Sequence, residues 1–216
     1  MEPVGYEVLY GRVDELIEII QRNAKRLQTL IGNILDVTRI ESQTLILNKE
    51  PFNIHELISS VIEGYKDRIK GTNVQLVLKN NNNNNPIFVE ADRDRIIQVL
   101  SNLLSNAIKF TDQGEISINL SERQDNENHE RKEVIVSVAD TGSGINSEIF
   151  SRLFSKFASK SFQGTGLGLF ICKSIIQAHG GRIWAEDSRM SEDKIGATIS
   201  FSLPTVTKVT EIITNE

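Results

Sequence analysis

The sequence is poor in cysteine, histidine and long apolar runs. Its one cysteine, Cys172, excludes an internal disulfide framework and fits a reducing cytosol. One cysteine and three scattered histidines do not supply the ligand set of a structural zinc site. No apolar run approaches the ~18 residues that span a bilayer, and no signal-peptide pattern follows Met1. We therefore expect a cytoplasmic chain without membrane contact of its own, although a longer parent protein could carry an anchor.

The overall charge is also low for a nucleic-acid-binding protein. The net charge is −5 over 216 residues, from 24 Lys and Arg against 29 Asp and Glu. This balance gives no support for binding nucleic acid. With 39% apolar and 25% charged residues, the composition is that of a globular protein, and the length fits one ordinary domain plus an appendage.

The first part of the chain is predicted to be one long helix, over residues 6–47. Its apolar residues follow a heptad pattern that Asn23 interrupts: Leu9, Val13, Leu16, Ile20, Leu27, Leu30, Ile34 and Val37. A lone helix of this length is marginal in water, so its apolar stripe needs a partner. Packing against the rest of the chain is one possibility. We favour self-association, because sustained heptads are typical of helical bundles.

The remainder predicts an α+β protein, a two-layer sandwich of helices on a mixed sheet of about five strands. Pro51 ends the first helix, and Asn53 with Glu56 forms a plausible capping pair. Apolar periodicity predicts helices over 54–69, 92–111 and 167–179, and one helical face for the aromatics at 150, 154 and 157. Alternation predicts strands over 74–78, 116–120, 134–139, 182–186 and 197–203. The six asparagines 80–85 are expected to form a hairpin loop before a return strand at 87–90, residues 121–132 a long loop, and residues 205–216 a loose tail.

One polar stripe on the 92–111 helix could bind a metal and phosphate. Asn102, Asn106 and Lys109 are spaced i, i+4 and i+7, so they share one side of the helix. Amide oxygens suit Mg²⁺ that bridges to phosphate, and a lysine can neutralise phosphate charge. The same spacing also fits the ordinary polar face of an amphipathic helix.

A second motif follows the 134–139 strand, in the run from Asp140 to Ile145. A carboxylate at a strand end can accept a hydrogen bond from an exocyclic amine such as that of adenine. Gly142 and Gly144 leave room for a flat base against the backbone. A simple turn would explain the same residues.

The third motif is the run Gly164, Thr165, Gly166, Leu167, Gly168, Leu169 before the 167–179 helix. Glycines at a helix start can form a cradle for phosphate. A dinucleotide fingerprint is the strongest alternative, and Glu186 has the right spacing for it. However, the third glycine comes one position early, and the preceding segment is a polar loop.

Taken together, these motifs resemble those of the sensor histidine kinases of two-component signalling, from about Asn23 to Pro204. The runs 102–111, 140–145, 150–157 and 164–169 look like the family's N, G1, F and G2 boxes, in the family's order. Residues 196–198 resemble its last glycine box. The resemblance implies the ATP-binding sandwich, of the Bergerat type, that is shared with gyrase B, Hsp90 and MutL.

The resemblance also implies residue roles. Asn106 would ligate Mg²⁺, Asp140 would recognise adenine, and Lys109 and Lys160 would contact phosphates. Asn102 stands where hydrolytic relatives have a glutamate base, and an amide cannot abstract a proton. The expected catalytic residues are therefore Asn102, Asn106 and Lys109. The expected nucleotide-binding residues are Asn106, Lys109, Asp140, Gly142, Gly144, Ile145, Lys160, Gly164, Thr165, Gly166, Leu167, Gly168 and Thr198.

One departure from the family concerns the phosphoacceptor. The family carries a histidine on the first dimerisation helix, whereas no histidine precedes Asn23, and His55 lacks the surrounding box. We therefore expect a truncated or engineered piece with a dimerisation helix (residues 1–50), an ATP-binding catalytic domain (51–205) and a tail (206–216). It would form a homodimer through the helix, serve a response regulator receiver domain, and transfer phosphate to a histidine outside this chain. A hydrolysing ATPase and a non-catalytic nucleotide-binding module remain as alternatives.

Overall fold

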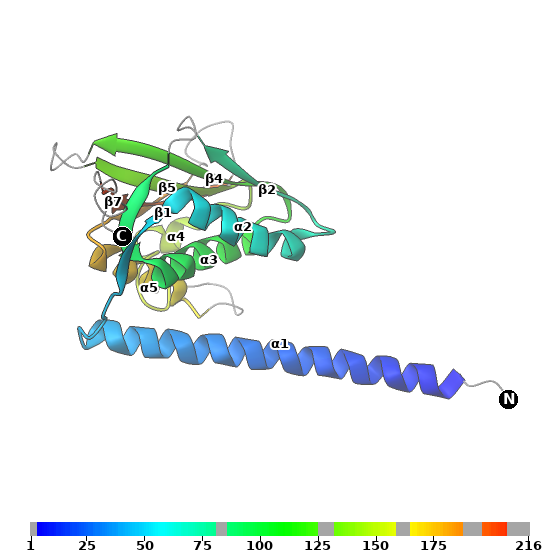
Figure 1. Ribbon diagram of the computed structural model, residues 1–216. Helices are drawn as coiled ribbons and strands as arrows, with labels where there is room; N and C mark the ends of the chain where they lie inside the picture. The colour runs from blue at the N-terminus through cyan, green and yellow to red at the C-terminus, as the bar shows by residue number, and fades with distance from the viewer. Residues whose placement is uncertain (1–3, 81–85, 125–131, 159–164, 188–195, 207–216) are drawn as a thin grey trace, which may run out of the picture. The chain divides into compact units, whose positions relative to one another are not determined.

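The computed structural model describes residues 4–80, 86–124, 132–158, 165–187 and 196–206 (Figure 1). The predicted asparagine loop at 81–85, most of the tail at 207–216, Lys160 and Gly164 lie outside these residues. The chain divides into two compact units, Met1–Leu45 and Ile46–Glu216, and each is described by itself.

The first unit is helix α1, Val4–Glu41. It ends earlier than the predicted residue 47, because the chain turns at Gln43, which has a φ of +56°. Apolar side chains of the heptad stripe are more than half exposed on this helix: Leu16, Ile20, Leu27 and Ile34. Within the described residues, no helix combines the length and the apolar character needed to cross a membrane. The exposed stripe is what self-association would bury, and the homodimer stays a prediction.

The second unit contains a mixed five-stranded sheet in the order β2-β4-β5-β7-β6, which confirms the predicted fold class. Strands β2 and β4 run parallel, and the other neighbours are antiparallel. The strand bounds are β2 Asn73–Asn80, β4 Gln113–Gln124, β5 Lys132–Asp140, β6 Ile183–Asp187 and β7 Ala197–Pro204. Strands β4 and β5 extend into the predicted 121–132 loop, and Thr205, the first residue of the predicted tail, donates to the Lys132 carbonyl at 2.9 Å.

A separate two-stranded sheet was missed by the sequence patterns. It pairs β1, Lys49–Asn53, with β3, Phe88–Asp92, in antiparallel register. The predicted hairpin between residues 74–78 and 87–90 is therefore wrong, because β2 pairs with β4 instead. Pro51 sits in β1 and faces Glu90. A proline is tolerated there because β1, among the described residues, pairs with β3 alone and so is an edge strand.

Helices α2 (Ile54–Ile69), α3 (Arg93–Phe110) and α5 (Gly168–Ala178) cover one face of the large sheet (Figure 1). Their apolar faces are buried as the periodicity predicted. Asn53 caps α2 by accepting from the His55 N–H at 3.1 Å, while Glu56 bonds the Asn53 side chain rather than its backbone. The predicted bond from a backbone N–H to the Asn53 side chain is therefore present, whereas the predicted bond from the Asn53 backbone N–H to Glu56 is replaced by one from the Asn53 side chain.

The segment after Asp140 departs most from its predicted form. Helix α4 spans only Ser147–Phe150 and gives way to turns. Phe150 and Phe154 still pack against the buried cluster of Ile145, Leu153 and Ala197. Phe157 has a φ of +60° and is 72% exposed, so it does not share their face.

A buried hydrogen-bond network ties the start of α3 to the end of α5. The Asp92 N–H donates to His179 Nε2 at 2.9 Å, and His179 Nδ1 lies 2.8 Å from the Ile175 carbonyl, to which it donates. The Asp92 carboxylate caps α3 at the Arg95 N–H and also accepts from the Asn48 N–H at 2.9 Å. His179 is 4% exposed and must be neutral to accept at Nε2.

This network predicts a pH dependence of stability. Burial lowers the pKa of His179, and Lys49 adds to the effect while Ile175 and Asp92 oppose it. Because the unfolded histidine titrates near ~6.5, the unfolded state binds more protons below that pH. The free energy of unfolding therefore falls as the pH drops below ~6.5. Urea unfolding between neutral and acidic pH is expected to show a shallower decline in the free energy of unfolding for His179→Gln than for the native chain. Equal slopes for the two proteins would contradict the assignment.

Candidate functional site

Asp140 ends strand β5 and is held in place by its own loop. Its Oδ1 accepts from the Gly142 N–H at 2.9 Å and from the Ala197 N–H at 3.4 Å. Burial raises the pKa of Asp140, and these two hydrogen bonds partly oppose the shift. Both contacts in the described part of the chain involve Oδ1, so Oδ2 can accept from a ligand. The carboxylate is thus a fixed, partly desolvated hydrogen-bond acceptor.

Two glycines let backbone segments meet around Asp140. A Cβ on Gly142 would lie 2.1 Å from the Phe110 carbonyl oxygen, and a Cβ on Gly196 would lie 2.0 Å from the Asp140 carbonyl oxygen. Gly196 also has a φ of +150°. No other residue fits either position without a backbone shift. The two glycines therefore join the end of α3, the end of β5 and the start of β7 at one place.

Thr141 fixes this loop to the neighbouring strand and was not among the predicted site residues. Its Oγ1 accepts from the Glu115 N–H at 3.0 Å, and its own N–H donates to the Glu115 carbonyl at 3.1 Å. Since Thr141 follows Asp140 directly, these bonds restrict where the carboxylate can point. The sequence signal was a hydroxyl residue between the aspartate and the first glycine, and the partner Glu115 could not be read from it.

One residue of the polar stripe of α3, Asn102, lies beside the start of α5. Asn102 and Asn106 are partly buried and Lys109 is exposed. The Asn102 Nδ2 atom is buried and has no hydrogen-bond partner among the described residues. A Cβ built on Gly168 would lie 3.5 Å from Asn102 Oδ1. The structure therefore brings Asn102 next to the glycine run, which the sequence alone could assign either to a phosphate cradle or to a dinucleotide fingerprint.

The first turn of α5 presents backbone N–H groups without a side-chain cap from its N-cap residue, Leu167. Thr165 Oγ1 accepts from the Leu167 N–H at 3.2 Å just before the helix. Gly166 has a φ of +67° and packs so tightly on Phe157 that a Cβ would come within 2.6 Å of its backbone. Free N–H groups at a helix start favour an anion such as phosphate.

The remaining predicted residues divide into two groups. Gly144 has a φ of +72° in the loop after Asp140, and Ile145 is buried in the adjoining cluster. Thr198 is not brought to the site. Ala197 pairs with Asp140 and shares its side of the sheet, and side chains alternate along a strand, so Thr198 points to the opposite face. The sequence-level assignment of Thr198 missed this alternation.

A cavity of about 460 Å³ adjoins the loop after Asp140. It is lined by Lys109, Phe110, Asp112, Gln113, Thr141, Gly142 and Ser143. Its volume lies in the range of small-ligand sites, ~300–1,000 Å³.

Among the described residues, no group of three His, Cys, Asp or Glu could hold a metal. A magnesium ion that arrives with a nucleotide needs only one or two protein oxygens, because phosphates and water supply the rest. The amides of Asn102 and Asn106 fit that role.

Comparison with known proteins supports the same interpretation. The family model described as "Histidine kinase-, DNA gyrase B-, and HSP90-like ATPase" matches residues 91–207. The chain is 32% identical to sensor histidine kinase WalK of Bacillus subtilis over 195 residues, which cover 86% of this chain and 30% of WalK.

Two solved structures are also similar. Full-length ShkA in complex with AMPPNP has a TM-score of 0.74 and 27% identity, over 90% of this chain and 39% of ShkA. Histidine kinase ThkA in complex with the response regulator TrrA has a TM-score of 0.67 and 33% identity, over 90% of this chain and 52% of that one. The chain thus spans less than a third of its curated relative WalK.

Proposed function

Because the chain belongs to the histidine kinase-, DNA gyrase B- and HSP90-like ATPases and contains the ATP-binding catalytic region of a sensor histidine kinase, we propose that it transfers the γ-phosphate of Mg·ATP to a histidine outside this chain. The observation that supports the proposal is that α3 lies against two candidate ligand-binding segments. Its last residue, Phe110, lies against Gly142 in the loop that fixes Asp140. Its Asn102 lies against Gly168, where the start of α5 offers N–H groups to phosphate.

The roles follow from the chemistry of each group. Asp140 accepts the exocyclic amine of adenine, and Lys109 contacts phosphate oxygens. Asn106 holds Mg²⁺, which neutralises charge on the phosphates when bound. Lys160 and the glycine run from Gly164 to Gly168 would close over the phosphate tail. Asn102 has no basic atom, so it cannot activate water, and transfer to a protein acceptor is favoured over hydrolysis.

The assembly around this site is part of the same proposal. Residues 1–50 would form the second helix of a dimerisation hairpin, and its exposed apolar stripe would pair two chains. Residues 51–205 would be the catalytic domain and 206–216 a tail. ThkA binds a response regulator in its solved complex, and we expect a receiver domain to accept phosphate from the phosphorylated histidine in the cytoplasm. The chain alone would then form no stable phosphohistidine.

Calorimetric titration with ATP, with and without Mg²⁺, tests the binding step. We expect saturable binding that Mg²⁺ strengthens. Addition of a separate hairpin that carries the acceptor histidine is expected to give an acid-labile phosphorylated hairpin. Binding without transfer would favour a nucleotide-binding module, steady release of phosphate would favour the hydrolase, and label on His55 would contradict an external acceptor.

The change Asp140→Asn separates recognition from folding. The asparagine Oδ1 can keep both hydrogen bonds of Asp140, but a charge-assisted acceptor for adenine is lost. The expected loss is ~2 kcal/mol, or about 30-fold in ATP affinity. Because burial raises the pKa of Asp140, the charged form destabilises the folded state at neutral pH, and thermal unfolding of the variant is expected at an equal or higher temperature. Unchanged affinity would exclude Asp140 from the site.

A further inference from the structure

The pairing of Thr141 with Glu115 continues the ladder between β4 and β5 one step past the end of β5. Ile116 faces Asp140 in this ladder, so the next antiparallel pair is Glu115 with Thr141. Two residues that face each other in this way can exchange two backbone hydrogen bonds. The first is present, because the Thr141 N–H donates to the Glu115 carbonyl at 3.1 Å. In place of the second, the Glu115 N–H donates to the side chain of Thr141, at 3.0 Å from Oγ1.

The Thr141 hydroxyl therefore takes the place of the backbone carbonyl that a continued strand would offer. The chain can leave the sheet directly after Asp140 and still keep two hydrogen bonds in the last pair. Because β4 lies between β2 and β5 in the sheet, its backbone is a firm anchor for the hydroxyl. Asp140 stands between this anchored residue and the rest of β5, so the hydroxyl helps to set the direction in which the carboxylate projects.

Gly114 makes room for the Thr141 hydroxyl. A Cβ on Gly114 would lie 2.2 Å from Thr141 Oγ1, and the glycine has a φ of +116°, which residues with a side chain rarely adopt. A side chain at this position of β4 would push the hydroxyl away from the Glu115 N–H. The hydroxyl bond after β5 thus depends on the missing side chain at residue 114.

We propose that Thr141 is a positioning residue that makes the proposed ATP site selective for a base with an exocyclic amine, an inference that rests on the proposed function. In the described part of the chain, both N–H groups that bind Asp140 meet Oδ1, which leaves Oδ2 to the amine. A hydrogen bond weakens steeply as its angle departs from linear, so its strength depends on where Oδ2 points. Loss of the Thr141 hydroxyl leaves Asp140 charged but held less firmly in one direction. Selectivity for the amine then falls, whereas contacts to the phosphates are unchanged.

The test compares the binding of ATP with that of purine riboside triphosphate, which has a hydrogen atom in place of the adenine amine. Calorimetric titration in the presence of Mg²⁺ gives both affinities, and the native chain is expected to favour ATP at least ~10-fold. Thr141→Val removes the hydroxyl and keeps the branched shape, and it is expected to lower this ratio ~5-fold through weaker binding of ATP alone. The effect is limited because Thr141 is exposed and water can compete for the bond. Thr141→Ser keeps the hydroxyl and is expected to keep the native ratio.

Matched variants separate the Thr141 hydroxyl from general effects of each substitution. Thr72→Val removes a hydroxyl that likewise accepts from a backbone N–H, that of Val74 at 3.4 Å, and is expected to keep the native ratio. Gly114→Ala displaces the Thr141 hydroxyl and is expected to lower the ratio as Thr141→Val does. Gly71→Ala also places a side chain at a positive φ, +83°, but this side chain meets nothing within 4 Å, so the native ratio is expected.

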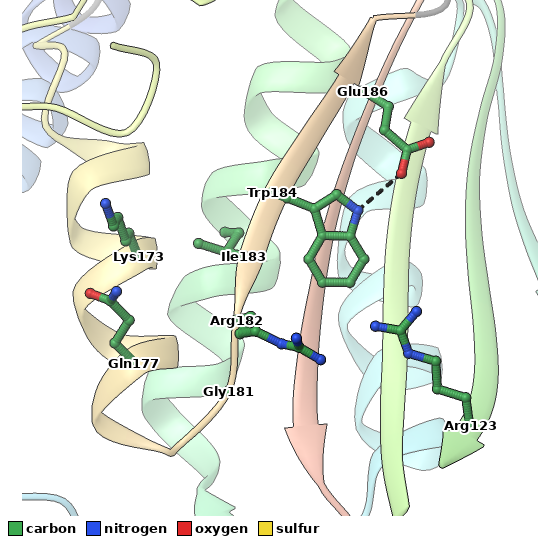
Figure 2. A pocket seen from close by; sticks show the side chains of 8 residues that line it. All are labelled: Arg123, Lys173, Gln177, Gly181, Arg182, Ile183, Trp184 and Glu186. Atoms are coloured by element: carbon green, nitrogen blue, oxygen red, sulfur yellow. Dashed lines mark hydrogen bonds between the residues drawn. The ribbon is translucent and has the colours of Figure 1, made fainter. Parts of the chain in front are cut away.

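Thermal unfolding of each variant can be followed by the fluorescence of Trp184, the chain's single tryptophan. Trp184 lines a second cavity, of about 520 Å³, where its indole N–H donates to Glu186 Oε1 at 3.0 Å (Figure 2). None of the substitutions changes a residue labelled in Figure 2. A change in the unfolding temperature therefore reports folding and not the surroundings of the indole.

The outcomes distinguish this inference from the proposed function. A folded Thr141→Val protein that keeps the native ratio, or that binds both nucleotides more weakly by the same factor, would overturn the role of Thr141 and leave the proposed function standing. Equal affinity of the native chain for the two nucleotides would overturn that role as well. Binding of neither nucleotide would overturn the proposed function together with it. If Thr141→Val does not fold, Thr141→Ala and Gly114→Ala give the same comparison.

Discussion

Replacement of Asn106 by alanine is expected to lower the affinity for ATP at least ~100-fold in the presence of Mg²⁺. The amide is the proposed metal ligand, and its loss leaves Mg·ATP without its oxygen from α3. Several kilocalories per mole of charge stabilisation depend on that ion, and ~2.7 kcal/mol already corresponds to 100-fold. In the absence of Mg²⁺ the variant and the native chain should bind ATP with similar affinity. Calorimetric titration under both conditions gives the comparison.

The neighbouring Ser105→Ala serves as the control for Asn106→Ala. Ser105 is one residue away on the same helix, is exposed, and lies 3.1 Å from the Tyr65 hydroxyl rather than in the polar stripe. Its change is expected to leave ATP affinity unaltered. If Asn106→Ala lowered affinity equally with and without Mg²⁺, the residue would act on the nucleotide or on folding, and not through the metal.

The second large effect is expected for Gly142→Ala, which should destabilise the fold by about 3 kcal/mol and abolish ATP binding. The new Cβ would lie 2.1 Å from the Phe110 carbonyl oxygen, and backbone atoms lie on both sides of that contact. The loop must therefore move, which breaks the Gly142 N–H bond to Asp140 and the Ser143 N–H bond to Phe110. Urea unfolding measures the loss of stability.

Gly64→Ala is the matched control for this change. Gly64 lies inside α2, and a Cβ there would meet nothing within 4 Å. Because alanine is the better helix former, this variant is expected to gain ~1 kcal/mol. A Gly142→Ala protein as stable as the Gly64→Ala protein would mean that the loop accommodates a side chain and that the close approach is not required.

The periodicity of apolar residues along the chain predicted most helices and strands of the fold. It could not predict which strands pair, because paired strands can lie far apart in the sequence. The apolar faces of α3 and α5 are periodic in sequence, so their burial could be predicted. The partner of β2 could not, because its parallel neighbour β4 lies more than thirty residues away and the 81–85 asparagines resemble a hairpin turn. Strand β1 contains Pro51, and a proline argues against a strand in the sequence unless that strand is known to lie at the edge of a sheet.

In the candidate site, too, features formed by neighbouring residues could be predicted and features formed by distant residues could not. Asp140 and Gly142 are two residues apart, and the carboxylate binds that glycine's own N–H, so the motif could be found locally. Gly196 meets the Asp140 carbonyl from 56 residues away, and Thr198 can be placed on its face only once the register of β5 with β7 is known. The prediction that Phe157 shares a helical face with Phe150 and Phe154 is wrong because α4 ends at Phe150.

The single cysteine has a practical consequence for following motion in this protein. Cys172 is completely buried, its Sγ lies 3.9 Å from the Val99 carbonyl, and burial raises the pKa of its thiol to about 12. At neutral pH it therefore carries almost no thiolate, the form that reacts with maleimides. A cysteine introduced at an exposed position, on α1 or near the glycine run, could carry a dye or spin label in the native background without removal of Cys172.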